Sequence, residues 1–108
     1  MKLNIKELND YFGHKGIKET LGYFLGLELN VGFSTSFGVE DQVITDLINE
    51  IDKSTYIFSL DTGRLHEETY KTIEQTVKKY DEMKFEFFYP DTSAVEKMVA
   101  ENGINLFY

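Results

Sequence analysis

The residues best suited to bind a charged ligand lie in a short polar loop between two apolar segments. Small side chains let backbone N–H groups approach a ligand, and hydroxyls donate to phosphate or sulfate oxygens. The helix expected after the loop adds partial positive charge at its N-terminus, which favours an anion. The loop therefore predicts an anion site, although a plain helix N-cap by Ser36, followed by the first-turn acids Glu40 and Asp41, explains the same residues. The loop consists of Ser34, Thr35, Ser36, Phe37 and Gly38.

A second loop whose residues could bind a ligand follows the next apolar segment. Gly63 allows a ligand to approach the backbone closely, and Asp61 can accept from a ribose hydroxyl or order the loop. Arg64 offers a planar cation to an anion, or simply lies in solvent at a strand-to-helix turn. His66 is interpreted as an exposed residue at the start of the following helix. The loop consists of Leu60, Asp61, Thr62, Gly63 and Arg64.

Composition excludes several classes of protein and site. The chain has 108 residues, enough for one small domain, and no cysteine, so it supplies no disulfide, thiolate ligand or thiol nucleophile. His14 and His66 cannot build a metal site alone, and we predict no catalytic residue and no metal ligand. A net charge of −8 argues against nucleic acid as a partner.

The sequence also lacks several recognisable motifs. The loops match neither standard phosphate-loop motif. Short apolar stretches predict no membrane span, and with no signal peptide visible after Met1 a cytoplasmic protein is expected.

The two loops are positioned by alternating strands and helices. Apolar residues at helical spacing predict two helical pieces within residues 4–26, and Ser93 with Glu96 forms a capping box at the start of the last helix. The alternation predicts an α/β fold with a parallel sheet, in which both loops follow the carboxyl ends of strands, where ligands bind. The expected strands are residues 29–34, 55–60 and 84–89, and the helices between and after them are residues 40–52, 66–81 and 93–102.

The predicted sheet has three strands, which is half of a doubly wound sheet of about six. The chain also reaches its last residues, Leu106–Tyr108, without a polar tail, so it reads as an interrupted fold. In a doubly wound sheet the first strand lies centrally. Its far side is therefore expected to be unpaired here, and an open apolar edge favours pairing with another chain. We expect a homodimer or larger assembly, unless the helices within residues 4–26 fold over the edge.

The sequence of the two loops resembles the adenylyl-sulfate and phosphoadenylyl-sulfate reductase family. The resemblance rests on FSTSFGVEDQ at residues 33–42 and on SLDTGRLHEETY at residues 59–70. The closing GINLFY at residues 103–108 resembles the stretch just before the first cysteine motif of that family. The two loop motifs in this order are far more specific than either one alone, and the resemblance covers about residues 30–108.

The resemblance implies the adenine-nucleotide α-hydrolase-like fold, which is related to the ATP pyrophosphatases. It implies adenylyl sulfate or phosphoadenylyl sulfate as substrate, with sulfite and the adenosine nucleotide as products. A cysteine near the C-terminus of the family attacks sulfur, thioredoxin or glutaredoxin releases sulfite, and members using adenylyl sulfate usually carry a 4Fe–4S cluster. By the same resemblance, residues 34–38 hold the phosphosulfate, residues 60–63 line the adenine and ribose, and Arg64 matches a position that is often arginine.

The chain departs from the family pattern because the nucleophilic and cluster cysteines have no counterpart within it. We therefore interpret residues 1–108 as a single N-terminal nucleotide-binding portion, with N-terminal helices in residues 4–26 and a βαβαβα unit in residues 29–103, and predict that it is inactive alone. Two alternatives remain. One is an ATP pyrophosphatase-type enzyme or sulfurtransferase of the same fold. Such enzymes usually show Ser-Gly-Gly-x-Asp-Ser at the first loop, which residues 34–38 do not supply. The other is a non-catalytic assembly module.

Overall fold

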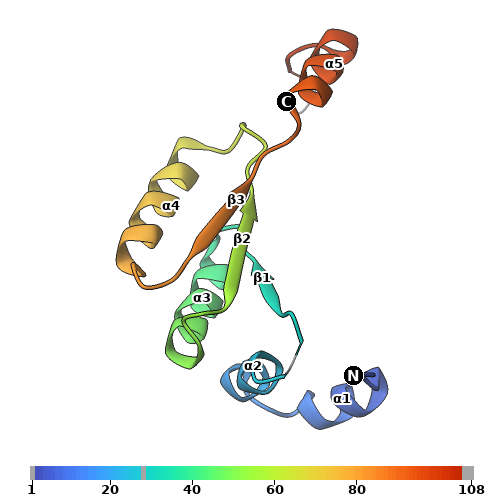
Figure 1. Ribbon diagram of the computed structural model, residues 1–108, viewed down its shortest axis with the longest axis vertical. Helices are drawn as coiled ribbons and strands as arrows, with labels where there is room; N and C mark the ends of the chain where they lie inside the picture. The colour runs from blue at the N-terminus through green and yellow to red at the C-terminus, as the bar shows by residue number, and fades with distance from the viewer. Residues whose placement is uncertain (1, 28, 106–108) are drawn as a thin grey trace.

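A computed structural model describes residues 2–27 and 29–105, and its elements alternate as the sequence predicts (Figure 1). Two short helices precede three βα repeats. The closing motif at residues 103–108 therefore falls partly outside the described residues, because Leu106–Tyr108 are not among them. The elements are α1 (Ile5–Phe12), α2 (Ile17–Leu25), β1 (Gly32–Ser34), α3 (Val39–Ile51), β2 (Tyr56–Leu60), α4 (Glu67–Lys79), β3 (Phe85–Phe88) and α5 (Thr92–Asn102).

The three strands form one parallel sheet in the order β1-β2-β3, which confirms the predicted α/β fold. Gly32 pairs with Tyr56, and Ile57 pairs with Phe85. A Cβ atom at Gly32 would lie 3.0 Å from the Tyr56 ring, so glycine permits the close approach expected there. Each connection leads from one strand to the next in the same direction across the sheet, and such connections are right-handed. Both α3 and α4 therefore lie on the same face of the sheet (Figure 1).

The hydrophobic core lies between this face and the two helices. Its centre consists of Ile48 from α3, Ile57 from β2, and Tyr80 and Met83 from the turn after α4. Ile48 and Ile57 are almost fully buried, with exposed fractions of 1% and 0%. Leu25 at the end of α2 also packs on this cluster, and Lys18 of α2 forms an ion pair with Glu50 of α3 at 2.9 Å. The N-terminal helices are thus attached to the repeat through α3.

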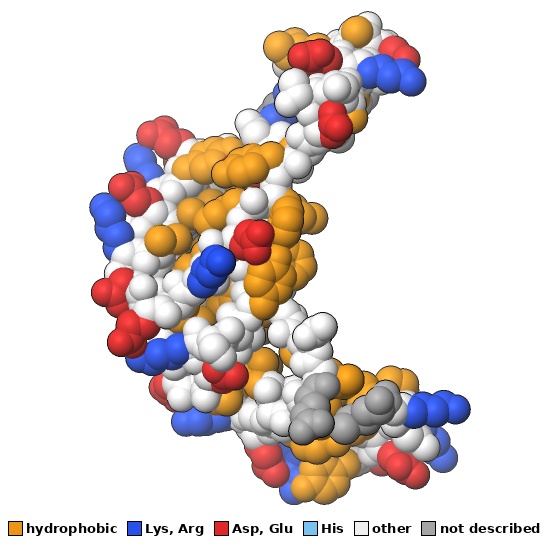
Figure 2. All heavy atoms as spheres, in the orientation of Figure 1, with side chains coloured by type: hydrophobic (Ala, Val, Ile, Leu, Met, Phe, Trp, Pro, Cys, Tyr) orange, Lys and Arg blue, Asp and Glu red, His pale blue; other side chains and the backbone are white. Residues whose placement is uncertain are grey.

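The opposite face of the sheet carries exposed apolar side chains. Tyr56 stacks on Phe58 with ring centroids 5.5 Å apart, and Phe58 meets Phe88 edge-on at 6.0 Å. Leu60, at the end of β2, is 63% exposed. Figure 2 shows apolar side chains gathered on the concave side of the molecule. The radius of gyration is 17.4 Å, against about 13 Å for a compact chain of this length, which reflects the open concavity.

Most element ends lie within one or two residues of the predicted ones, and two of the differences have a clear structural cause. The first strand begins at Gly32 rather than at residue 29, because its partner strand begins at Tyr56 and the preceding Thr55 turns back to bond the carbonyl of Asp52. The last helix begins at Thr92, because its N-cap is Asp91 and not Ser93. The Asp91 side chain accepts from the backbone N–H groups of Ser93 and Ala94. The predicted end is confirmed, since Gly103 closes α5 with a φ of +85°.

Candidate functional site

Both predicted loops lie at the carboxyl edge of the sheet, after the neighbouring strands β1 and β2 (Figure 1). Two adjoining hollows open there, of about 290 Å³ and about 250 Å³, and Leu60 lines both. The first hollow is rich in hydroxyls, whereas the second is walled by apolar and aromatic groups. The first is lined by Ser34, Thr35, Ser36, Asp41, Ser59, Leu60 and Leu65. The second is lined by Leu60, Asp61, Thr62, Phe88, Tyr89 and Pro90.

The structure thus brings together most of the predicted site residues but not all. Phe37 points into the protein instead, where it is 6% exposed and stacks on Phe87 with ring centroids 6.0 Å apart. Its φ of +61° lies in the left-handed region, which is uncommon for a residue other than glycine. Phe37 therefore anchors the first loop to the sheet, and packing stabilises its unusual backbone. Gly38, Gly63 and Arg64 belong to the loops without lining either hollow.

The backbone N–H groups of residues 35–38 in the first loop all bond within the protein. Ser36 donates its N–H and its hydroxyl to the same Oδ2 atom of Asp41, each at 2.7 Å. A ligand that uses these donors must take the place of the Asp41 carboxylate. The other bonds run from Thr35 N to Phe58 O (2.9 Å), from Phe37 N to Thr35 Oγ1 (3.0 Å) and from Gly38 N to Ser36 Oγ (3.2 Å).

Sequence reasoning did not foresee this role of Asp41. It treated Asp41 as a first-turn acid and Ser36 as the alternative N-cap, but the N-cap of α3 is Gly38 and has no side-chain capping bond. The signal was available in the spacing, because a carboxylate on the first turn of a helix can reach back to the N–H groups before it. Asp41 lies three residues after Gly38.

The second loop is ordered by a buried carboxylate. Asp61 is 8% exposed, and its Oδ1 atom accepts the Gly63 N–H at 2.7 Å and the Tyr70 hydroxyl at 2.9 Å. Gly63 has a φ of +83°, a conformation in which glycine is favoured. The hydrogen bond to Asp61, with a smaller effect of burial, raises the pKa of Tyr70. Of the two roles predicted for Asp61, the structure provides the contacts for ordering the loop.

Arg64 connects the second loop to the segment after α5. Its guanidinium donates to the carbonyl oxygen of Ile104, and the residue is half-buried, so Arg64 has a contact within the chain as well as access to solvent. His66 is the N-cap of α4 and is exposed, as the sequence predicts.

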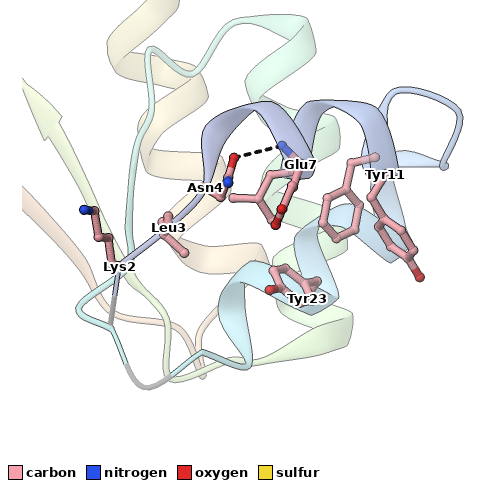
Figure 3. A pocket seen from close by; sticks show the side chains of 8 residues that line it. Lys2, Leu3, Asn4, Glu7, Tyr11 and Tyr23 are labelled. Atoms are coloured by element: carbon pink, nitrogen blue, oxygen red, sulfur yellow. Dashed lines mark hydrogen bonds between the residues drawn. The ribbon is translucent and has the colours of Figure 1, made fainter.

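A third hollow, of about 410 Å³, lies on the N-terminal helices and away from the strand ends (Figure 3). Tyr11 of α1 and Tyr23 of α2 line it, and Asn4 caps α1 by accepting the Glu7 N–H at 3.1 Å. None of the predicted site residues contributes to its wall.

Within residues 2–27 and 29–105, no three His, Cys, Asp or Glu side chains are grouped as a metal site would require. The sequence has no thiolate for an iron–sulfur cluster, so such a cluster does not fit these residues. None of the helices in the described part of the chain is long and apolar enough to cross a membrane.

Comparison with known proteins agrees with the loop motifs. Residues 30–108 match the family model of the phosphoadenosine phosphosulfate reductase domain. The chain is 36% identical to the adenosine 5′-phosphosulfate reductase of Sinorhizobium fredii (strain NBRC 101917 / NGR234) over 108 residues, which is all of this chain and 43% of the relative. It is 38% identical to that of Rhizobium meliloti (strain 1021) over 100 residues, or 93% of this chain and 37% of the relative.

The reductase of Pseudomonas aeruginosa (strain LESB58) is 40% identical over 83 residues, which cover 77% of this chain and 30% of the relative. The chain therefore spans less than half the length of these curated relatives. The matched region includes both loops, all three strands and the helices between them. The chain belongs to the phosphoadenosine phosphosulfate reductase family.

Proposed function

We propose that this chain is the nucleotide-binding portion of a reductase of sulfate assimilation, which converts adenylyl sulfate or phosphoadenylyl sulfate to sulfite and the adenosine nucleotide. The observation that carries the proposal is the adjoining pair of hollows at Leu60, formed by the two motif loops of a chain in this family. The relatives are named adenosine 5′-phosphosulfate reductases, which favours adenylyl sulfate as the substrate.

In this proposal the two hollows divide the nucleotide between them. The hydroxyl-rich hollow at residues 34–36 receives the phosphosulfate, whose oxygens accept from the loop donors. The apolar and aromatic hollow beside Thr62 receives the adenosine, since bases favour stacking on aromatic groups. Leu60 lies at the junction of the two.

The chemistry at sulfur needs a thiolate. In the proposed reaction a cysteine thiolate attacks the sulfate sulfur, the bond from sulfur to the bridging phosphate oxygen breaks, and the nucleotide leaves. A dithiol of the thioredoxin or glutaredoxin class then releases sulfite and becomes a disulfide. These 108 residues contain no cysteine, so they bind and orient the nucleotide but do not supply the nucleophile. We place the reaction in the cytoplasm, where sulfite would supply cysteine biosynthesis.

We also propose that the chain self-associates as a homodimer. The support is the apolar part of the sheet formed by the exposed Tyr56 and the half-buried Phe58, away from the hollows, together with β1, whose one strand partner among the described residues is β2. A two-fold arrangement would cover this face on both subunits at once. In sedimentation equilibrium we expect a species heavier than 12.6 kDa that dissociates on dilution. A single 12.6 kDa species at every concentration would contradict the dimer.

Calorimetric titration with adenylyl sulfate and, separately, with ATP tests the proposed function. We expect micromolar to millimolar binding of adenylyl sulfate, weaker binding of ATP, and no sulfite from adenylyl sulfate with thioredoxin and a reductant. Ser36→Ala and Gly63→Val should weaken binding by about tenfold, because each alters one loop. Tighter binding of ATP would favour an ATP pyrophosphatase-type enzyme, and no binding of either nucleotide would favour an assembly module.

A further inference from the structure

One polar contact joins the second loop to a helix that lines neither hollow of the site. Tyr70 lies in the first turns of α4, and its hydroxyl reaches Oδ1 of Asp61 at 2.9 Å. The same oxygen accepts the Gly63 N–H at 2.7 Å. A single carboxylate oxygen therefore connects the end of β2, the turn after it and the following helix.

The geometry explains why this oxygen matters for the loop. Asp61 continues the sheet, because its N–H donates to the carbonyl of Phe88 at 2.8 Å, and the residue is 8% exposed. Two residues later the backbone turns through the left-handed Gly63. The exposed Thr62 lies between these two fixed points, at the wall of the apolar hollow. The direction of the loop tip is thus set by the bond between Asp61 and Gly63.

We propose that Tyr70 is a positioning residue for nucleotide binding, because its hydroxyl holds the Asp61 carboxylate in the orientation that fixes the turn at Gly63. The inference rests on the proposed function, since it concerns how the same site holds its nucleotide. Asp61 then acts as an acceptor for the protein's own donors, and its negative charge is not the property that the nucleotide needs.

The Tyr70 hydroxyl lies outside both hollows, so its effect on a ligand passes through Asp61. A loop held in its bound shape loses less conformational entropy on binding, which raises affinity without a new contact. Removing the hydroxyl should leave the packing of α4 unchanged, because phenylalanine keeps the ring. The contribution of Tyr70 can therefore be separated from a loss of folding.

The test is an NMR titration of the ¹⁵N-labelled chain with two probes, adenylyl sulfate and inorganic sulfate. For Tyr70→Phe we expect the Gly63 amide resonance to move and adenylyl sulfate to bind about five- to tenfold more weakly, with sulfate binding at the first loop unchanged. Asp61→Ala should weaken nucleotide binding more strongly, whereas Asp61→Asn should stay within about threefold, because an amide oxygen accepts the same two bonds. Tyr11→Phe, on the exposed face of α1, is the matched control.

The outcomes distinguish the two proposals. If the unaltered chain binds no adenylyl sulfate, the proposed function fails, and the positioning role fails with it. If the unaltered chain binds and Tyr70→Phe binds equally well, or leaves the Gly63 amide unmoved, the positioning role is overturned and the proposed function stands. If Asp61→Asn loses as much affinity as Asp61→Ala, the charge of Asp61 acts on the nucleotide directly, which also overturns the inference.

Discussion

The Asp41 carboxylate accepts both the N–H and the hydroxyl of Ser36, so one oxygen of α3 holds two donors of the first loop. Asp41 lies in the first turn of α3, where its negative charge also interacts favourably with the partial positive charge of the helix N-terminus. The contact ties the loop to the helix that follows it. It thereby stabilises the polar wall of the site when no ligand is bound.

We predict that Asp41→Ala lowers the free energy of unfolding by about 1–2 kcal/mol, because both hydrogen bonds from Ser36 to the carboxylate are lost. Glu40→Ala removes the same charge from the same turn, but Glu40 lies outside the contact with Ser36. It should cost about 0.5 kcal/mol or less. Urea denaturation of the two variants provides the comparison, and equal losses would show that only the helix dipole is involved.

Ile48→Ala should be among the most destabilising single changes, because Ile48 is 1% exposed at the centre of the core. Deleting its buried methyl and methylene groups leaves a cavity and costs about 2–5 kcal/mol. Val43→Ala on the same helix removes an apolar side chain that is 54% exposed, and about 1 kcal/mol or less is expected. Thermal unfolding followed by circular dichroism measures both, and similar melting temperatures would contradict the assigned core.

Replacing glycine by alanine should have opposite effects on the stability of the fold at two positions. An added Cβ meets open space at Gly63 and at Gly22, so sterics with neighbouring residues do not distinguish them. Gly63 has a φ of +83°, which costs a residue with a side chain about 1–2 kcal/mol. Gly22 lies inside α2, where alanine stabilises a helix by about 1 kcal/mol. Chemical denaturation should therefore show a loss for Gly63→Ala and a gain for Gly22→Ala, and a loss at both would contradict this account.

Stability should fall at alkaline pH through Tyr80. Burial, reinforced by the hydrogen bond from its hydroxyl to Asp46 at 2.8 Å, raises the pKa of Tyr80 in the folded chain. The unfolded chain then loses this proton first, so the contribution is full below about pH 10 and is lost as the pH rises through the folded-state pKa. Tyr80→Phe should lower the melting temperature at pH 8 but flatten its decline between pH 9 and 11. A decline as steep as that of the unaltered chain would contradict the role of Tyr80.

The sequence was sufficient to predict the order of the elements and the edge of the sheet at which the two loops lie. Apolar residues at helical spacing located α3 and α4, and β-branched and aromatic runs located β2 and β3, because burial of one face sets these periods. The loops could then be placed at one edge of the sheet, because parallel strands all end there. The strand β1 was the exception, since its length depends on where β2 begins.

The inner contacts of the site could not be predicted in the same way. Phe37 reads as part of a ligand loop, yet tertiary packing on Phe87 turns it inward. Tyr70 reads as one residue of a buried stripe, and only the fold brings its hydroxyl to Asp61, nine residues earlier. Such hydrogen bonds depend on side-chain directions across two elements, which spacing along one element does not determine.

The strand order β1-β2-β3 has a consequence for how the chain folds. Each strand pairs with the next one in sequence, but a whole helix lies between the partners, from Gly32 to Tyr56 and from Ile57 to Phe85. Closing such a loop costs chain entropy before the pairing stabilises it, and parallel sheets are intrinsically slow to form. We expect the helices to form first and the sheet to follow stepwise, one repeat at a time. The apolar concave face would then be exposed in the nascent chain, which makes this stage the one most open to aggregation.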